Sequence, residues 1–371
     1  MIKNGTNILV VTSEFPPQPG GIGNHAFHLA AHLQHCGMEV QVLSDNRSLD
    51  GDVEKAFDQS FKVKVHRISV RRFRFLMYLK RIRVLFRVIK SVDVVLASGK
   101  FSLWAVAFAS WFYHKTFVAV VHGTEVNFKS FVLKRSIEVA LKRFTKVICV
   151  SNYTKSLIAH LKLKQVAVIP NGIDTSKWQA SAVKHVALEG HPKLVTVGNV
   201  TERKGQLQVI RQLPELLKTF PELQYHCIGI PTERERFLEV AKQLHVDAHI
   251  TFHGAVDDVR LKQLVASCDI FVMLSSATAT GDVEGFGIAI LDANALGLPA
   301  IGSLGCGIED AIQPNQSGVL IPVDDGTAFV KAISTINENK EVFAENANKW
   351  ASEHDWKIIV ERYLELLTQS L

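Results

Sequence analysis

Short runs of β-branched and other apolar residues alternate along the chain with longer stretches whose apolar positions recur at helical spacing. Asn7 to Thr12 (NILVVT) is typical of a buried strand, and Asn24 to His35 of an amphipathic helix. Further strands are expected in the first half at residues 40–43, 92–97, 118–121 and 147–150. Strands separated by helical stretches predict a parallel sheet with right-handed crossovers.

The same pattern begins again after Pro170-Asn171-Gly172. Strands are expected at residues 194–197, 224–228, 250–252, 270–273, 300–301 and 319–321. Trp356 to Leu367 predicts a last amphipathic helix. The repeated pattern indicates an α/β protein with two doubly wound domains.

Length and composition allow two sizeable cores, because 371 residues are present and 47% of them are hydrophobic. This composition excludes a disordered chain, a collagen and a disulfide scaffold. The five scattered cysteines show no zinc spacing and no redox pair, which suits a reducing cytosol. The first residues do not resemble a signal peptide, and the longest apolar window, Phe101 to Tyr113, is shorter than the roughly 20 residues of a bilayer span.

The net charge of +6 comes from one segment, since Gln59 to Val92 holds eleven Lys or Arg and no acid. Within Arg71 to Lys90, apolar and basic residues alternate at near-helical spacing. Such a helix is compatible with a solvated surface, with nucleic acid or with anionic lipid headgroups. No nucleic-acid recognition motif accompanies it, so the lipid surface is the favoured partner.

A glycine-rich segment, Gly20 to Gly23, lies between the first strand and the first helix, where amides can hold a phosphate. Gly21 to Ala26 also matches G-x-G-x-x-A, and Asp45 follows the second strand, as in NAD(P)-dependent oxidoreductases. However, Ser13 to Pro19 separate the strand from the glycines, so the tight turn of that motif is missing. A phosphate or sugar loop is therefore favoured over a dinucleotide site and over a plain turn.

Charged and polar residues follow several other strands. His122 comes directly after a strand, where a side chain reaches the ligand crevice of an open α/β sheet, although a lone histidine is more often structural. Arg203 and Lys204 follow the first strand of the second half. Two cations at such a turn can neutralise a diphosphate, but they can also be solvated charges.

A second glycine-rich loop, Gly281 to Gly287 (GDVEGFG), precedes the expected helix Ile288 to Leu296. Free amides at the positive end of a helix can bind phosphate oxygens. Glu284 and Asp292 flank the apolar run between them. A glycine turn with a solvated acid is the alternative.

Taken in this order, the segments resemble the retaining nucleotide-sugar glycosyltransferases of family 4, which have the GT-B architecture. The resemblance covers nearly the whole chain, through PPQPGGIGNHA, HGTE, VSNYT, IPNGID, VGNVTERKGQ, FHGAV, EGFGIAILDANALGLP and HDWKIIVERYLELL. It implies two Rossmann-like domains facing each other across a cleft. Residues 1–175 would form the acceptor-side domain and 176–350 the nucleotide-sugar domain, with helix 351–371 packing back on the first domain.

The resemblance also implies roles for individual residues. His122, Glu284, Arg203 and Lys204 would form the catalytic group, in which His122 contacts the transferred sugar and Glu284 faces its ring. The donor would be bound by Gly21, Gly23, Gly198, Arg203, Lys204, Phe286, Gly287 and Asp292. Asp292 stands where the family usually has Glu, so its contact with the ribose is in doubt. Asn199 stands where many members have a cation, and its role is open.

The expected activity is transfer of a hexose, with retention, from a nucleotide-diphosphate sugar to a lipid-linked or saccharide acceptor in cell-surface glycan synthesis. The GDVEG loop looks like the version found in family members that use GDP-mannose, and this resemblance favours that donor over a UDP-sugar. Two cations and helix-end amides would stabilise the leaving diphosphate, and no D-x-D element is well placed, so no metal or other cofactor is expected. The protein would be cytoplasmic, peripheral on the inner membrane face, and docked through Arg71 to Lys90. The alternatives are an NAD(P)-dependent oxidoreductase and a non-enzymatic lipid-binding protein.

Overall fold

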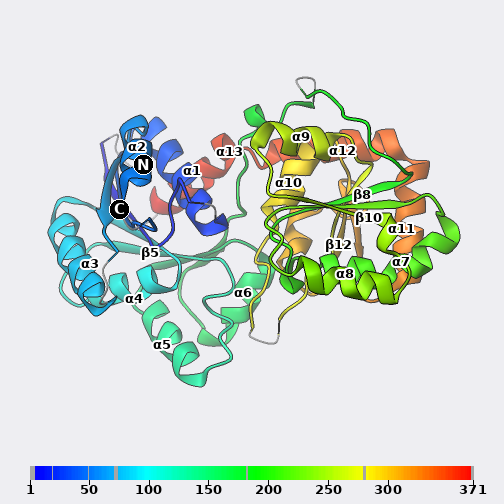
Figure 1. The fold of residues 1–371 in the computed structure, drawn as a ribbon. Helices are drawn as coiled ribbons and strands as arrows, with labels where there is room; N and C mark the ends of the chain where they lie inside the picture. Colours follow the sequence, from blue (N-terminus) through cyan, green and yellow to red (C-terminus); the bar gives the residue numbers. More distant parts are fainter. Residues whose placement is uncertain are drawn as a thin grey trace. The chain divides into compact units, whose positions relative to one another are not determined.

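The computed structural model describes residues 5–18, 20–48, 50–70, 74–180, 183–278 and 281–368. Its contacts divide the chain into two compact units, Met1–Gly172 with Trp356–Leu371, and Ile173–Asp355. Each unit contains one sheet whose strands are all parallel, with helices packed on it (Figure 1). The two doubly wound α/β domains expected from the sequence are confirmed.

The sheet of the first unit has seven strands in the order β3-β2-β1-β4-β5-β6-β7. Their bounds are β1 (Asn7–Thr12), β2 (Glu39–Asp45), β3 (Lys64–Ile68), β4 (Val94–Ser98), β5 (Thr116–Val121), β6 (Lys146–Cys149) and β7 (Val166–Val168). The strands expected from the sequence are confirmed with small shifts at their ends. The strands β3 and β7, which form the two edges of the sheet, were not predicted from the sequence. Edge strands are partly exposed and therefore lack a continuous apolar run.

The helices of this unit are α1 (Gly21–His35), α2 (Asp52–Ser60), α3 (Arg74–Val88), α4 (Lys100–Ala109), α5 (Phe131–Leu141), α6 (Asn152–Ile158) and α13 (Trp356–Thr368). Right-handed crossovers place α1 and α2 on one face of the sheet and α3, α4 and α5 on the other (Figure 1). Leu85 of α3, Leu103 of α4 and Ile137 of α5 belong to one core with the sheet residues. The last helix, α13, packs on α1 through Trp356, which stacks on the His28 ring.

The sheet of the second unit has six strands in the order β10-β9-β8-β11-β12-β13. The strands are β8 (Lys193–Val197), β9 (Gln224–Ile228), β10 (Ile250–Gly254), β11 (Ile270–Met273), β12 (Ala300–Ser303) and β13 (Gly318–Ile321). The helices are α7 (Gln206–Thr219), α8 (Arg234–Gln243), α9 (Asp258–Ala266), α10 (Ile288–Ala295), α11 (Gly326–Glu338) and α12 (Lys340–Glu353). The six strands expected here are confirmed.

Both sheets reverse their strand order beside their first strand, between β1 and β4 and between β8 and β11. In open α/β sheets, ligands bind outside the carboxyl ends of the strands at such a point. The loops that follow β1, β4, β8 and β11 therefore lie where a ligand site is expected. Among the described residues, no helix has both the length and the apolar character that a membrane span requires.

The contact of α13 with α1 should contribute strongly to the stability of the first unit. Trp356 is 1% exposed and contacts the rings of His25, His28 and His32. Trp356→Ala should destabilise the unit by about 3–5 kcal/mol, the range for truncating a buried aromatic residue. Calorimetry should show this as a lower melting temperature. Trp111→Ala is the control, because Trp111 is 64% exposed and its loss should hardly change the melting temperature.

Candidate functional site

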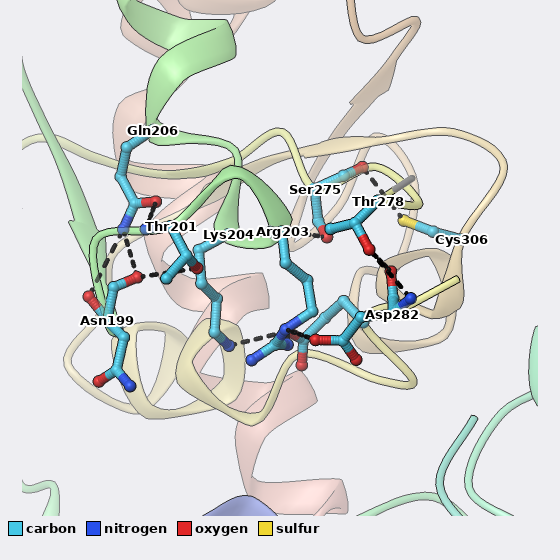
Figure 2. Close-up of polar contacts among 11 residues, drawn as sticks. Asn199, Thr201, Arg203, Lys204, Gln206, Ser275, Thr278, Asp282 and Cys306 are labelled. Carbon is cyan, nitrogen blue, oxygen red and sulfur yellow. Dashed lines mark hydrogen bonds and ion pairs between the residues drawn. The ribbon is translucent and has the colours of Figure 1, made fainter. Parts of the chain in front are cut away.

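Two cations and two carboxylates meet in the second unit. Arg203 and Lys204 lie in the short 3-10 helix η5 (Glu202–Lys204), and both bind the Oε2 atom of Glu284, with Lys204 Nζ at 2.8 Å. Arg203 Nε also lies 3.2 Å from Oδ2 of Asp282. Figure 2 shows both basic side chains extending from the same short segment toward the loop that carries Asp282. The structure thus brings three of the expected catalytic residues together.

Close backbone packing holds this cluster at the carboxyl ends of β8 and β11, which are neighbours in the sheet. Gly205 follows Lys204 with a φ of +82°, and a Cβ there would lie 2.2 Å from the carbonyl of Leu274, just after β11. Only glycine fits such a conformation and such an approach. Ser275 follows Leu274, and its hydroxyl donates a hydrogen bond to the carbonyl of Arg203 (Figure 2). This bond joins the same two segments that are in contact at Gly205.

The cluster keeps Glu284 ionised. Burial alone raises the pKa of Glu284, but the charges of Lys204 and Arg203, together with their hydrogen bonds, outweigh burial and hold this pKa below its ordinary value. The Glu284 side chain is only 12% exposed. At neutral pH it is therefore a carboxylate that accepts hydrogen bonds and has no proton to give.

Asp292 lies on α10, and its pKa is shifted upward, in the direction opposite to that of Glu284. Burial raises its pKa to about 7, although the charges of Lys262 and Lys177 oppose the shift. Near neutral pH this carboxyl group can both donate and accept a hydrogen bond. Its helix begins after Gly287, which has a φ of +92°, and the first amides of a helix have no acceptor within it.

Gly198 follows β8 with a φ of +142°, and a Cβ there would lie 3.0 Å from Cε of Lys204. The glycine thus leaves room for the lysine side chain. Asn199 and Arg203 line one side of a pocket of about 450 Å³, and Thr278 and Asp282 line the other. The carbonyl of Asn199 accepts hydrogen bonds from Gln206 and Thr201 (Figure 2).

His122 lies in the first unit, at the end of β5. Its Nε2 atom is 2.9 Å from the Ser98 hydroxyl at the end of β4, and its amide donates to Glu125 at 2.6 Å. Burial lowers the pKa of His122 to about 4, so the ring is neutral at pH 7. Burial also raises the pKa of Glu125 to about 7, against the hydrogen bond from the His122 amide.

The two glycines expected at the donor differ in their surroundings. A Cβ on Gly23 would lie 3.0 Å from backbone atoms of Glu14 and Phe15, so Gly23 permits the segment after β1 to pack against α1. A Cβ on Gly21 would meet nothing within 4 Å. Gly21 thus faces open space, while Gly23 has a packing role that the motif alone did not reveal.

Several residues of these sites were missed in the sequence analysis. Asp282 belongs to the GDVEG loop, and the available signal was a second carboxylate in the same glycine-rich loop as Glu284. Ser98 gave a weaker signal, as the last residue of a buried strand. Ser275 binds Arg203 through the backbone carbonyl, which no residue pattern reports.

Arg81 requires a correction within the basic stretch Arg71 to Lys90. The helix α3 forms, but Arg81 is 3% exposed, and its Nε atom donates to Asp45 at 3.0 Å. Its guanidinium carbon lies 3.8 Å from the centre of the Phe101 ring. Arg81 is therefore an interior cation and not part of a lipid-facing surface. Arg71 and Arg72 lie outside the described residues.

Two family models match the chain in succession. Residues 19–177 match "Glycosyltransferase Family 4", and residues 179–353 match "Glycosyl transferases group 1". The chain belongs to these glycosyltransferases. The family resemblance seen in the sequence is thereby confirmed, and the enzyme is a glycosyltransferase.

Relatives and solved structures agree with this assignment. The glycosyltransferase is 25% identical over 352 residues to a "GDP-mannose-dependent alpha-(1-6)-phosphatidylinositol monomannoside mannosyltransferase" of Mycobacterium tuberculosis, covering 90% of this chain and 89% of that one. It is also 25% identical to a "Putative colanic acid biosynthesis glycosyltransferase WcaL" of Escherichia coli, over 56% of this chain and 52% of the other. The structure of Anabaena HepE with UDP and glucose superposes with a TM-score of 0.78 at 18% identity, covering 98% and 100% of the two chains. This likeness confirms the GT-B fold.

The raised pKa of Asp292 has a consequence for stability. In the unfolded chain an Asp ionises near pH 3.9, whereas Asp292 in the folded state ionises near pH 7. Between these values the folded state holds the extra proton, so Asp292 lowers stability as the pH rises from about 4 to 7. Asp292→Asn should melt at a higher temperature than the wild type at pH 8.

The gain should amount to about 1–2 kcal/mol, because the half-buried carboxyl group is partly screened by solvent. The wild type and the variant should differ little at pH 4.5. Asp324→Asn, at an exposed position of the same unit, should show no gain at either pH. An Asp292→Asn protein whose melting temperature equals that of the wild type at both pH values would contradict the assignment.

Proposed function

We propose that the enzyme transfers a hexose, with retention, from a nucleotide-diphosphate sugar to a lipid-linked or saccharide acceptor in cell-surface glycan synthesis. The cluster of Arg203, Lys204 and Glu284 carries this proposal. One carboxylate oxygen of Glu284 binds both cations. A diphosphate would offer the cations more charge and more acceptor oxygens, so they would bind it while remaining beside Glu284.

The leaving group sets the chemistry at this cluster. Breaking the bond between sugar and diphosphate puts negative charge on the β-phosphate, and Arg203 and Lys204 would stabilise that charge. In the proposal, the amides of Phe286 and Gly287 add hydrogen bonds to the phosphates at the start of α10, and Gly198 leaves room for Lys204. Asp292 would bind the ribose hydroxyls. Two protein cations supply the charge that a metal ion supplies elsewhere, so we propose that transfer needs no metal.

Retention could in principle proceed through a covalent intermediate on Glu284. The contacts of Glu284 with Arg203 and Lys204 disfavour that route. The Oε2 atom of Glu284 accepts bonds from two cations, and both interactions lower the nucleophilicity of a carboxylate. We therefore favour front-face transfer, in which the departing phosphate accepts the proton of the attacking hydroxyl. The neutral ring of His122 would bind a hydroxyl of the transferred sugar, and Gly21 and Gly23 would border the donor.

For the donor we propose GDP-mannose. The names of the mycobacterial relatives specify GDP-mannose, and the GDVEG loop resembles the version found in family members that use this donor. HepE was solved with UDP and glucose, so UDP-sugars are the alternative that the experiment must separate. An NAD(P)-dependent oxidoreductase is disfavoured because Asp45, the acidic residue of that motif, is bound to Arg81.

We further propose that residues 1–175 with helix 351–371 receive the acceptor, and that α3 docks on the inner membrane face from the cytoplasm. Arg83 and Arg87 are exposed on α3, Lys90 is exposed in the short 3-10 helix that follows it, and the first turns of α3 expose Phe75 (64%) and Leu79 (52%). On the same face of the sheet, α5 exposes apolar side chains as well, Phe131 and Val132. A surface of exposed apolar and basic residues suits anionic lipid headgroups.

A donor panel tests the activity. At a concentration of 100 Kd, GDP-mannose should stabilise the protein by about 2.7 kcal/mol in thermal shift, and UDP-glucose and UDP-galactose should do so less. Lys204→Ala should lower kcat/KM for GDP-mannose by about 10², the loss typical of removing one charge-stabilising group. Lys218→Ala, a substitution of an exposed lysine in the same unit, should not change it.

The same assay separates the alternatives. EDTA should leave the rate unchanged, and a strict need for Mg²⁺ would contradict the metal-free mechanism. Stabilisation by NADH, with every nucleotide sugar inert, would contradict the transferase and support the oxidoreductase. Lipid binding with all donors inert would support the non-enzymatic protein.

Vesicle co-sedimentation tests the docking. Each cation near an anionic surface contributes about 1 kcal/mol, so Arg83→Glu, Arg87→Glu and Lys90→Glu together should abolish binding to anionic vesicles. Binding of the wild type should weaken between about 0.1 and 0.5 M salt. In the matched control, three exposed lysines of the second unit are replaced by Glu: Lys242, Lys331 and Lys349. This variant should bind anionic vesicles like the wild type. Equal binding to neutral and anionic vesicles would contradict docking by charge.

A further inference from the structure

A buried polar contact joins the last helix of the chain to the ring that touches His122. The Tyr363 hydroxyl on α13 lies 3.0 Å from Nε2 of His25 on α1. The His25 ring then meets the His122 ring edge to face, with centroids 5.0 Å apart and planes at 80°. His25 is 1% exposed and Tyr363 is fully buried, so their contact is shielded from solvent.

The positions of the protons on His25 and Tyr363 determine which of the two residues donates the hydrogen bond between them. Burial, with smaller contributions from His122 and His28, lowers the pKa of His25 well below its ordinary value, so the His25 ring is neutral and carries one N–H. Tyr363 carries one O–H, and a single hydrogen bond joins the two residues. Among the described residues, Nδ1 of His25 has no hydrogen-bond partner. One of the two protons is therefore left without an oxygen or nitrogen acceptor.

The phenol proton is the better one to satisfy, because a neutral imidazole nitrogen is a strong acceptor and a buried hydroxyl left unpaired is costly. Tyr363 then donates to Nε2, and the ring proton of His25 resides on Nδ1. The aromatic rings of His122 and Trp356 are the neighbours available for an N–H···π contact. This arrangement requires the Tyr363 hydroxyl.

We infer that His25 and Tyr363 are positioning residues for His122. Tyr363 fixes the tautomer of His25, and the His25 ring fixes the plane of His122, whose Nε2 stays on the Ser98 hydroxyl. The Nδ1 atom of His122 is then the one presented to a hydroxyl of the donor sugar. This inference rests on the proposed function for that last step only, since the ring arrangement exists without a substrate.

His32 provides the matched control, because it lies on the same helix and contacts Trp356 without contacting His122. A change there alters the packing of α1 on α13 but leaves the contact of His25 with His122 in place. Tyr363→Phe is the decisive variant, since it removes one hydroxyl and keeps the ring that fills the core. His25→Phe keeps an aromatic ring against His122 and removes both nitrogens.

The first measurement needs no substrate. In protein labelled with ¹⁵N-histidine, the ring ¹⁵N shifts report the tautomer of each histidine. Wild-type His25 should show a protonated Nδ1, and Tyr363→Phe should shift the ring signals of both His25 and His122. His32→Gln should leave the His122 signals unchanged. Unchanged His122 signals in Tyr363→Phe would overturn the inference, whether or not any donor is turned over.

The second measurement separates positioning from packing. Tyr363→Phe should lower kcat with GDP-mannose about tenfold, as expected for a misplaced contact, at an unchanged KM and a nearly unchanged melting temperature. His25→Phe should lower kcat further, and His32→Gln should keep the wild-type kcat. If Tyr363→Phe and His32→Gln lower kcat and melting temperature alike, the contact is one of packing and the inference fails. If the donor panel shows no transfer at all, the proposed function fails, and the ¹⁵N shifts still decide the positioning.

Discussion

The shared carboxylate of Glu284 is the interaction on which the second unit's site depends. Arg203 and Lys204 are adjacent in the chain, and two like charges so close would repel each other without an acid between them. Glu284 supplies that acid from the loop that follows β11, and Gly205 lets the two loops lie in contact. The two cations are thus held in fixed positions, which is the kind of preorganisation that stabilises developing negative charge with little rearrangement.

In the first unit, the polar groups near His122 are held without charge, unlike the charged cluster at Glu284. Around His122, burial removes charge: His122 and His25 are neutral, and the pKa of Glu125 is raised to about 7. A neutral histidine offers hydrogen bonds of either sense, which suits the recognition of sugar hydroxyls. The second unit thus carries fixed charge at the ends of its strands, whereas the first carries neutral hydrogen-bonding groups.

The sequence predicted the architecture well because buried parallel strands such as β1 and β11 have an unmistakable apolar pattern. It did not predict β3, because the KVHRI segment places charged residues on a half-exposed edge strand.

The cation pair and its partner acid in the candidate site were predictable, since glycines and charges at the ends of strands indicate a site. The interior position of Arg81 was not, because it depends on Asp45 and Phe101, which lie on other elements. Pairing between distant residues is set by topology and leaves no local pattern. The contact between His25 and Tyr363, 338 positions apart, is the extreme case.

The assignment of α13 to the first unit bears on how the protein is made. The second unit, Ile173–Asp355, is continuous in sequence and is complete before α13 leaves the ribosome. The first unit begins earlier but receives Trp356 and Tyr363 only after the second unit has been synthesised, so His25 and His28 lack these partners throughout translation of the second unit. The unit whose synthesis begins first is therefore completed after the second unit, and a nascent chain without α13 leaves the aromatic side chains of α1 uncovered and open to chaperones and proteases.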